Sequence, residues 1–154
     1  MQQVMIDREL KTEVVGILND DTISELIEQE KKEPIASFLG IKLEELRPGY
    51  AKVSMKIRAE FLNFNNYVFG GIIMSLADQA FAYATNSMHL PSIASQVTIY
   101  FLSAPKPGDT LTGECMVIKK GKRIDISEMT VTDHNGRLIA KATGTTVPVT
   151  NKEQ

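Results

Sequence analysis

One acidic residue stands alone in a long uncharged part of the sequence. Asp78 is the only Asp, Glu, Lys or Arg between Glu60 and Lys106. Burying a carboxylate in apolar surroundings is costly, and the loss of water raises its pKa. Such a group can act as a general base or a nucleophile. The alternative is that Asp78 faces solvent, or pairs across a subunit contact for structure alone.

Two glycines, Gly70 and Gly71, open the predicted helix that carries Asp78. Free N–H groups and the helix dipole make the start of a helix a site for negative charge, and glycine lets a carbonyl oxygen approach closely. Donors of this kind stabilise the oxyanion of an acyl-transfer intermediate, by roughly 3 kcal/mol for one donor. Tight packing or a turn is the alternative reason for this pair.

Other polar residues are candidates for holding a substrate. Asn63 and Asn66 carry amides that can bind a substrate carbonyl or a water, or instead shape a turn. Ser75 lies with Gly71 and Asp78 on a stripe of small side chains. Four basic residues at a predicted hairpin tip can bind ligand phosphates or simply face solvent: Lys119, Lys120, Lys122 and Arg123.

Other common chemistries find few suitable residues in this sequence. Two histidines and one cysteine make a structural zinc site a poor fit. His89 comes just after the predicted helix and His134 falls in a predicted hairpin turn, which disfavours a Ser-His-Asp triad. The sequence contains no phosphate-binding glycine loop, no dinucleotide fingerprint and no His-Glu-x-x-His motif. We therefore expect carboxylate chemistry.

A mainly β-structured chain surrounds the predicted helix. Apolar residues recur every three or four positions from about Gly70 to Thr85, so we expect a helix buried on most sides. Alternating apolar residues and turn signals predict strands at residues 41–46, 50–57, 93–103, 110–120, 123–132 and 138–147. We expect the last four to form a meander. The order predicts an α+β fold with one long central helix wrapped by an antiparallel sheet.

The N-terminal part differs in charge from the rest. Residues 1–35 contain nine acidic and four basic side chains, whereas residues 36–154 contain ten and thirteen. Residues 22–33 predict a helix that ends before Pro34. We divide the chain into an N-terminal helical extension, residues 1–35, and a main domain, residues 36–150.

The composition is typical of a globular protein. The chain has 154 residues, of which 43% are hydrophobic and 23% charged. Its net charge of −2 argues against nucleic-acid binding, and no apolar run reaches the length of a membrane helix. Because we see no secretory signal, we expect a cytoplasmic protein.

The central segment resembles the PaaI-type thioesterases, a family of the hot-dog superfamily named for phenylacetate degradation. The family pattern is an Asn, then His-Gly-Gly, then a helix with Leu-Ala-Asp. Here it reads Asn63, then Phe69-Gly70-Gly71, then Leu76-Ala77-Asp78. The resemblance extends over roughly residues 34–149. Two positions depart from it, since Phe69 replaces the usual His and Asn66 replaces a Gly.

The resemblance implies hydrolysis of an acyl-CoA, with a medium-chain or aryl acyl group, by a homodimer or homotetramer (a dimer of dimers). Asp78 would activate water or attack the thioester from across the dimer. The N–H of Gly70 or Gly71 would polarise the carbonyl, and Asn63 would orient substrate or water. The resemblance implies no metal ion and no redox cofactor. Phe69 has no hydrogen-bonding group and can line an acyl pocket instead. The alternative is a non-catalytic acyl-CoA-binding protein with the same fold.

Overall fold

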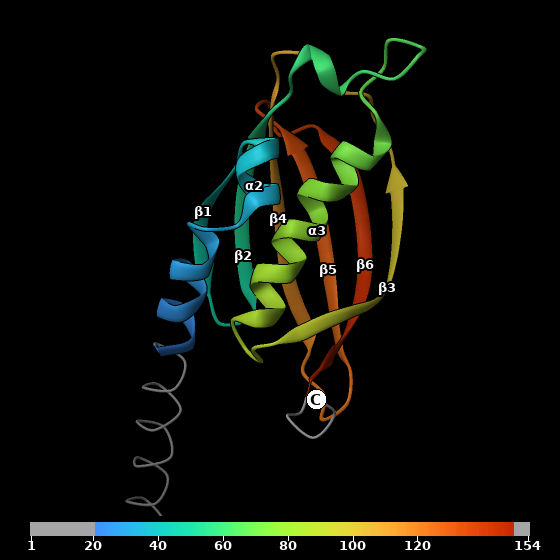
Figure 1. Cartoon of the computed structure of the whole chain (residues 1–154). Helices are drawn as coiled ribbons and strands as arrows, with labels where there is room; N and C mark the ends of the chain where they lie inside the picture. Colours follow the sequence, from blue (N-terminus) through green and yellow to red (C-terminus); the bar gives the residue numbers. More distant parts are fainter. Residues whose placement is uncertain (1–20, 150–154) are drawn as a thin grey trace, which may run out of the picture.

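Six antiparallel strands form one sheet, and one long helix packs against it (Figure 1). The computed structural model describes residues 21–149. A helix over residues 21–30 comes first. The elements that follow are α2 (Pro34–Leu39), β1 (Ile41–Arg47), β2 (Tyr50–Lys56), the single turn η1 (Ala59–Phe61), α3 (Gly70–Asn86), β3 (Ser92–Phe101), β4 (Thr110–Lys119), β5 (Asp125–Asp133) and β6 (Leu138–Pro148). This is the predicted α+β hot-dog arrangement.

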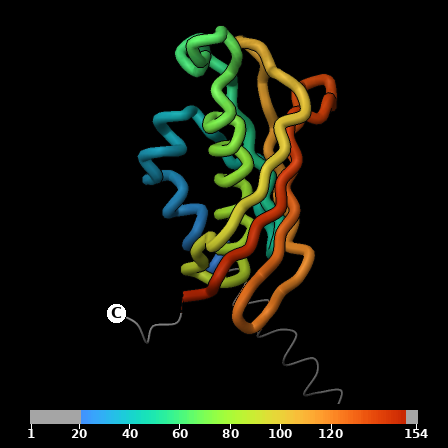
Figure 2. The backbone as a smooth tube through the Cα atoms, turned by 90° about the vertical axis from the view of Figure 1, so that its right-hand side faces the viewer, coloured from blue at the N-terminus to red at the C-terminus, as the bar shows by residue number. Residues whose placement is uncertain are grey.

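The strand order in the sheet is β1-β2-β4-β5-β6-β3. The predicted four-strand meander is therefore wrong for β3, whereas β4, β5 and β6 pair in succession as expected. β4 lies between β2 and β5, whereas β3 pairs with β6 at the edge of the sheet (Figure 2). The connector over residues 102–109 carries the chain past the ends of β6 and β5. A period of two identifies a strand but not its neighbours, which is why the sequence suggested the simpler order.

α3 is buried against the sheet and open along one stripe. Its buried apolar side chains are Ile73, Leu76, Ala77, Ala80, Phe81, Tyr83 and Ala84. The open stripe contains Gly71, Met74, Ser75, Asp78 and Ala82, which are at least partly exposed. The helix is therefore covered on the sheet side as predicted, but this stripe is left without a covering layer.

Glycine lets α3 approach β4 closely. A Cβ on Gly113 would lie 2.9 Å from the backbone oxygen of Leu76.

Within residues 21–149, neither α3 nor another helix has the length and apolar character to cross a bilayer. The cytoplasmic location stays a prediction.

The N-terminal helices pack on the same core as the sheet. Leu26 and Leu39 belong to the buried apolar cluster that surrounds α3. Glu33 ties the two parts together, because its Oε2 accepts hydrogen bonds from Tyr83 Oη (2.7 Å) and Gln79 Nε2 (2.8 Å). The first helix ends at residue 30, earlier than predicted. The division into extension and main domain stays a prediction.

Candidate active site

Asp78 lies midway along the open stripe of α3. Its side chain is exposed, and it makes no hydrogen bond or ion pair with any residue from 21 to 149. Neighbouring atoms nevertheless remove part of the water around the carboxylate, and this desolvation raises the pKa of Asp78 above its ordinary value. An unpaired carboxylate that is more basic than usual is suited to accept a proton.

Two backbone N–H groups at the start of α3 are free to bind a ligand. The helix begins at Gly70, after Phe69, whose backbone is extended (φ −61°, ψ 127°). Ile72 N donates a 2.9 Å hydrogen bond to Phe69 O, whereas the N–H groups of Gly70 and Gly71 find no acceptor in the described part of the chain. They lie at the positive end of the helix dipole, where an oxyanion is stabilised.

Asp78 and the free amides share one face of α3 but not one site. Gly71 and Asp78 are two helical turns apart, so both project in the same direction. A rise of 1.5 Å per residue separates them by about 10 Å along the axis. One thioester group cannot contact both within a single chain, so a reaction that uses both requires a second copy.

Two aromatic rings border the free amides. The Phe69 ring rests against Gly71, where any Cβ would collide with it, and a Cβ on Gly70 would lie 3.2 Å from Phe101 Cζ. Both rings are about half exposed, Phe69 at 58% and Phe101 at 51%. The residue that replaces the family's His therefore forms an apolar wall beside the amides.

A cavity of about 340 Å³ opens next to Gly70. Its lining is uncharged and mostly apolar, with Tyr67, Val68, Ile73, Phe101, Leu102 and Pro105 among its residues. This size and lining are typical of a small-molecule site. Sequence reasoning missed Phe101 and Leu102, since only the pairing of β3 with β6 places the end of β3 beside the start of α3.

The loop over residues 62–68, before α3, is held by hydrogen bonds from its backbone to the side chain of Asn63. Asn63 Oδ1 accepts hydrogen bonds from Asn65 N (2.9 Å) and Tyr67 N (3.2 Å). This leaves the Asn63 Nδ2 amide as the group that can reach a substrate. Asn66 is exposed and has a left-handed backbone (φ 61°), which glycine adopts freely and asparagine tolerates. That backbone explains why Asn66 stands where the family has Gly.

Ser75 uses its hydroxyl proton within α3. Its Oγ donates a 2.8 Å hydrogen bond to Gly71 O, one turn earlier. The oxygen can still accept a hydrogen bond from a ligand, because a hydroxyl has two lone pairs. Ser75 therefore lies between Gly71 and Asp78 as an acceptor on the open stripe.

The basic residues lie far from the free amides in the same chain. Lys119, Lys120, Lys122 and Arg123 are all exposed, in or beside the turn between β4 and β5. This turn and the start of α3 lie at opposite ends of the molecule (Figure 1). Within one chain the basic turn therefore cannot reach a ligand at the free amides. An inverted second copy would bring its own basic turn to the end of the first chain where α3 begins.

The histidines and the cysteine do not line the cavity beside Gly70. His89 Nε2 lies 3.7 Å from the buried carboxylate of Asp125, and His134 is exposed in the turn between β5 and β6. Burial raises the pKa of the Cys115 thiol to about 12, so its nucleophilic thiolate is disfavoured. From residue 21 to residue 149, no three His, Cys, Asp or Glu side chains are grouped to hold a metal ion.

Comparison with known proteins agrees with this geometry. Residues 65–140 match the model of the Thioesterase superfamily. The chain is 38% identical to the acyl-coenzyme A thioesterase PaaI of Escherichia coli K12, over 68% of this chain and 75% of that protein. The family match includes all of α3 and residues 65–69 before it.

Solved structures share this fold over most of the chain. The structure of E. coli PaaI, from the phenylacetic acid degradation operon, superposes with a TM-score of 0.82 at 32% identity, over 86% of this chain and 96% of that one. A Streptococcus mutans protein solved with acetyl-CoA superposes with a TM-score of 0.68 at 26% identity, over 71% and 88% of the two chains.

Proposed function

Because the chain belongs to the thioesterase superfamily, as a PaaI-type thioester hydrolase with the hot-dog fold, we propose that it hydrolyses a medium-chain or aryl acyl-CoA to the free acid and CoA. The observation that carries this proposal is the open stripe of α3. It presents an unpaired carboxylate with a raised pKa, Asp78, and the unpaired amide of Gly71 on one face. The PaaI relative is named for acyl-CoA hydrolysis, which supports the same substrate class.

The proposed active unit is a homodimer formed through β3 and the open stripe of α3. β3 is an edge strand of the sheet. Charged residues and prolines usually protect an edge strand from pairing with another chain, and β3 contains neither. It also exposes large apolar side chains, with Ile93 at 59% and Tyr100 at 65%. In the proposed twofold contact, Asp78 of one chain lies opposite Gly70 and Gly71 of the other, and the same arrangement occurs a second time with the roles exchanged. The homotetramer stays a prediction.

In this dimer the reaction needs three groups. Asp78 of one chain takes a proton from a water molecule as that water attacks the thioester carbonyl carbon. The N–H groups of Gly70 and Gly71 of the other chain bind the oxyanion that forms. When the C–S bond breaks, the sulfur of CoA leaves and takes up the proton from Asp78, which returns the carboxylate to its starting state.

The cavity beside Gly70 supports the choice of acyl group. The carbonyl carbon must lie next to the free amides, so the acyl chain begins at the entrance to this cavity. The lining offers aromatic and aliphatic side chains and no charge. Such a lining favours an aryl or medium aliphatic group over a charged one.

The CoA end of the substrate has a separate requirement. Its phosphates are expected to meet the basic turn, residues 119–123, of the partner chain, because the twofold contact inverts one copy relative to the other. The S. mutans neighbour was solved with acetyl-CoA, which supports a CoA ester as ligand.

The direct test is release of CoA thiol from a panel of acyl-CoA esters, followed with a thiol reagent. We expect turnover above background, greatest for aryl or medium-chain esters, and a loss of at least about a hundredfold with Asp78→Asn. Binding of the esters by calorimetry without any turnover would instead support the non-catalytic alternative.

A further inference from the structure

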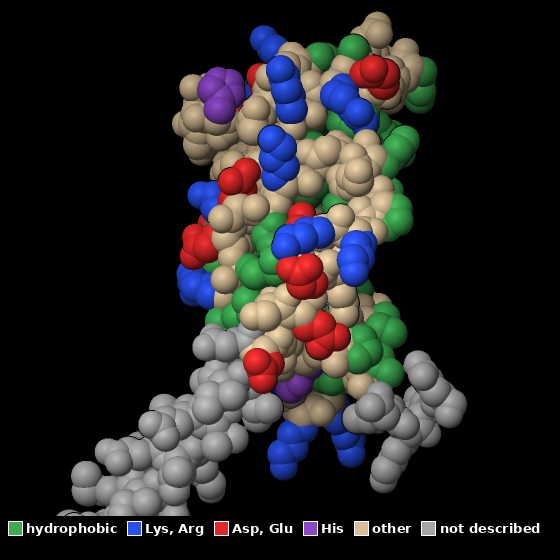
Figure 3. Space-filling view, turned by 60° about the vertical axis from the view of Figure 1, so that its left-hand side comes forward, with side chains coloured by type: hydrophobic (Ala, Val, Ile, Leu, Met, Phe, Trp, Pro, Cys, Tyr) green, Lys and Arg blue, Asp and Glu red, His purple; other side chains and the backbone are tan. Residues whose placement is uncertain are grey.

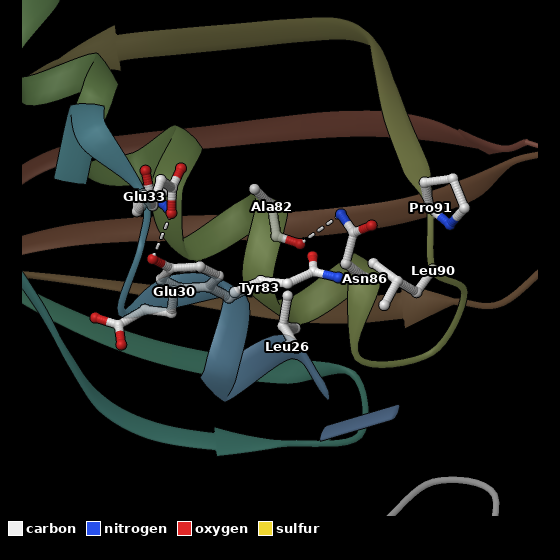
Figure 4. Close-up of a pocket in the computed structure, with 10 residues that line it drawn as sticks. Leu26, Glu30, Glu33, Ala82, Tyr83, Asn86, Leu90 and Pro91 are labelled. Carbon is white, nitrogen blue, oxygen red and sulfur yellow. Dashed lines mark hydrogen bonds between the residues drawn. The ribbon is translucent and has the colours of Figure 1, made fainter. Parts of the chain in front are cut away.

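A second cavity, of about 360 Å³, lies between the N-terminal helix over residues 21–30 and the later half of α3 (Figure 4). Leu26, Ala82, Leu90 and Pro91 supply its apolar surface. Ala82 follows Asp78 by one turn on the open stripe, so this cavity continues the surface that we assign to the dimer contact.

The charged groups that line this cavity are hydrogen-bond acceptors, so they favour an occupant with hydrogen-bond donors. Both charged residues in the lining are acidic, Glu30 and Glu33. Glu33 already accepts hydrogen bonds from Gln79 and Tyr83, as Figure 4 shows for Tyr83. The Glu30 carboxylate accepts none from the residues that the structure describes. An occupant should therefore bring an apolar group and neutral or positive donors, and an anion is repelled.

The loop over residues 62–68 offers these groups. Phe64 is 94% exposed and Tyr67 is 62% exposed, so the loop presents aromatic rings that their own chain does not cover. The bridge from Leu62 to Val68 closes the loop, and the two hydrogen bonds to Asn63 Oδ1 hold its backbone. A rigid loop loses little conformational entropy when it docks.

The twofold geometry brings this loop to that cavity. The step rests on the proposed function, in which Asp78 of one chain faces Gly71 of the other. The axis then crosses α3 close to Ser75, and each contact occurs twice with the roles exchanged. The loop lies beyond Gly71 at one end of α3 (Figure 1), and the cavity lies beyond Asp78 toward the other end. The loop of one chain therefore lies over the cavity of its partner.

We propose that Phe64 of one chain inserts into the cavity between helix 21–30 and α3 of a second copy. The neighbouring amides of Asn65 and Asn66 supply donors within reach of Glu30. The helix over residues 21–30 thereby becomes part of the subunit contact. It also supports the partner's loop that carries Asn63, which gives this helix a role in positioning the site.

Tryptophan fluorescence tests the insertion, because the chain has no tryptophan of its own. In Phe64→Trp, we expect blue-shifted emission in the dimer that shifts to the red as dilution yields monomer. Phe38→Trp is the matched control, since Phe38 is also highly exposed (70%) but lies on α2. Its emission should stay red in both states.

A quencher locates the ring in this cavity. Phe64→Trp chains are mixed with Gln29→Cys chains that carry a nitroxide label, since Gln29 lines the cavity and Cys115 is buried. We expect quenching by the label at residue 29 and none by the same label on Asn135→Cys, in the turn between β5 and β6.

The energetic test is the dimer dissociation constant, measured by sedimentation. A buried aromatic anchor commonly contributes enough that its loss weakens a contact about tenfold or more. We expect this for Phe64→Ala and no change for Phe38→Ala. The insertion is overturned, and the proposed active unit left standing, if Phe64→Trp dimers emit in the red without quenching and Phe64→Ala leaves the dissociation constant unchanged. A wild-type chain that is monomeric at every concentration overturns both.

Discussion

The two edges of the sheet are built differently. β1 carries charged residues of both signs, including Lys42, Glu44 and Arg47, and Figure 3 shows acidic and basic side chains spread over that side of the molecule. β3 has no charged residue in its whole length and exposes large apolar side chains. Charges protect an edge from pairing with another strand. The contrast supports the proposal that β3, and not β1, pairs with a second chain.

The candidate catalytic groups lie on the side of the molecule that carries β3. Phe101, at the end of β3, borders the free amides of α3, and Asp78 lies two turns along the same helix face. If two copies pair through β3, Asp78 of one chain and the free amides of the other form one complete site. Changes on the β3 side should therefore alter activity or assembly, and matched changes on the β1 side should not.

The largest effect is expected for Asp78→Asn. The amide keeps the shape of the side chain but cannot accept the proton of the attacking water, so kcat should fall by about 10²- to 10⁴-fold. Thiol release from the best acyl-CoA measures it. Glu44→Gln makes the same chemical change on β1 and should leave kcat unaltered. Full activity of a folded Asp78→Asn protein would contradict the assigned role.

Next comes Gly70→Pro, which deletes one amide donor. Proline is well tolerated at the first position of a helix, and the extended backbone of Phe69 suits a residue before proline. Loss of one oxyanion donor should lower kcat by about 10²- to 10³-fold. Gly70→Ala places the same Cβ near Phe101 but keeps the N–H, so it should remain far more active. Equal losses in both variants would point to crowding instead.

A smaller effect is expected when charges are added to the edge of β3. Gln96 and Thr98 are uncharged residues on the edge strand, and Gln96→Lys with Thr98→Lys brings like charges together across the twofold axis. The dimer dissociation constant should rise about tenfold or more. Glu44→Lys on β1 is the control. Unchanged sedimentation of the doubly substituted protein would argue that the copies meet elsewhere.

The smallest effect is a shift in the pH profile. Asp78 must be ionised to act as a base, so kcat/KM should fall as the pH drops through its pKa. Desolvation raises that pKa, so the midpoint of the acid limb should lie above the ordinary value of 3.8. A midpoint at 3.8, as for a freely hydrated carboxylate, would indicate that Asp78 keeps its full hydration during the reaction.

The sequence predicted the positions of helices and strands better than it predicted which strands pair. The alternation of Ala51, Val53 and Met55 with polar residues locates β2, and the helix predicted from Gly70 to Thr85 is α3 within one residue. Strand order was not predictable in the same way. It depends on where the connector over residues 102–109 returns the chain, and local periodicity contains no such information.

The same limit applies to the site. Asp78 was identifiable because no other charged residue is near it in sequence. Gly70 and Gly71 were identifiable because two consecutive glycines mark the start of the same helix. Phe101 was not, because only strand pairing brings it to Gly70. Asn66 was predicted as a substrate contact, whereas its left-handed backbone supplies a structural reason for its position. The role of each residue in catalysis stays a prediction.

The central claim is that one site takes its carboxylate and its amides from different chains. Refolding a mixture of Asp78→Asn and Gly70→Pro chains tests it most directly, since each variant alone forms two damaged sites. A mixed dimer pairs the intact Asp78 of one chain with the intact Gly70 of the other, so random mixing should restore about a quarter of the wild-type activity. Activity no higher than that of the separate variants, although mixed dimers form, would contradict a site shared between two chains.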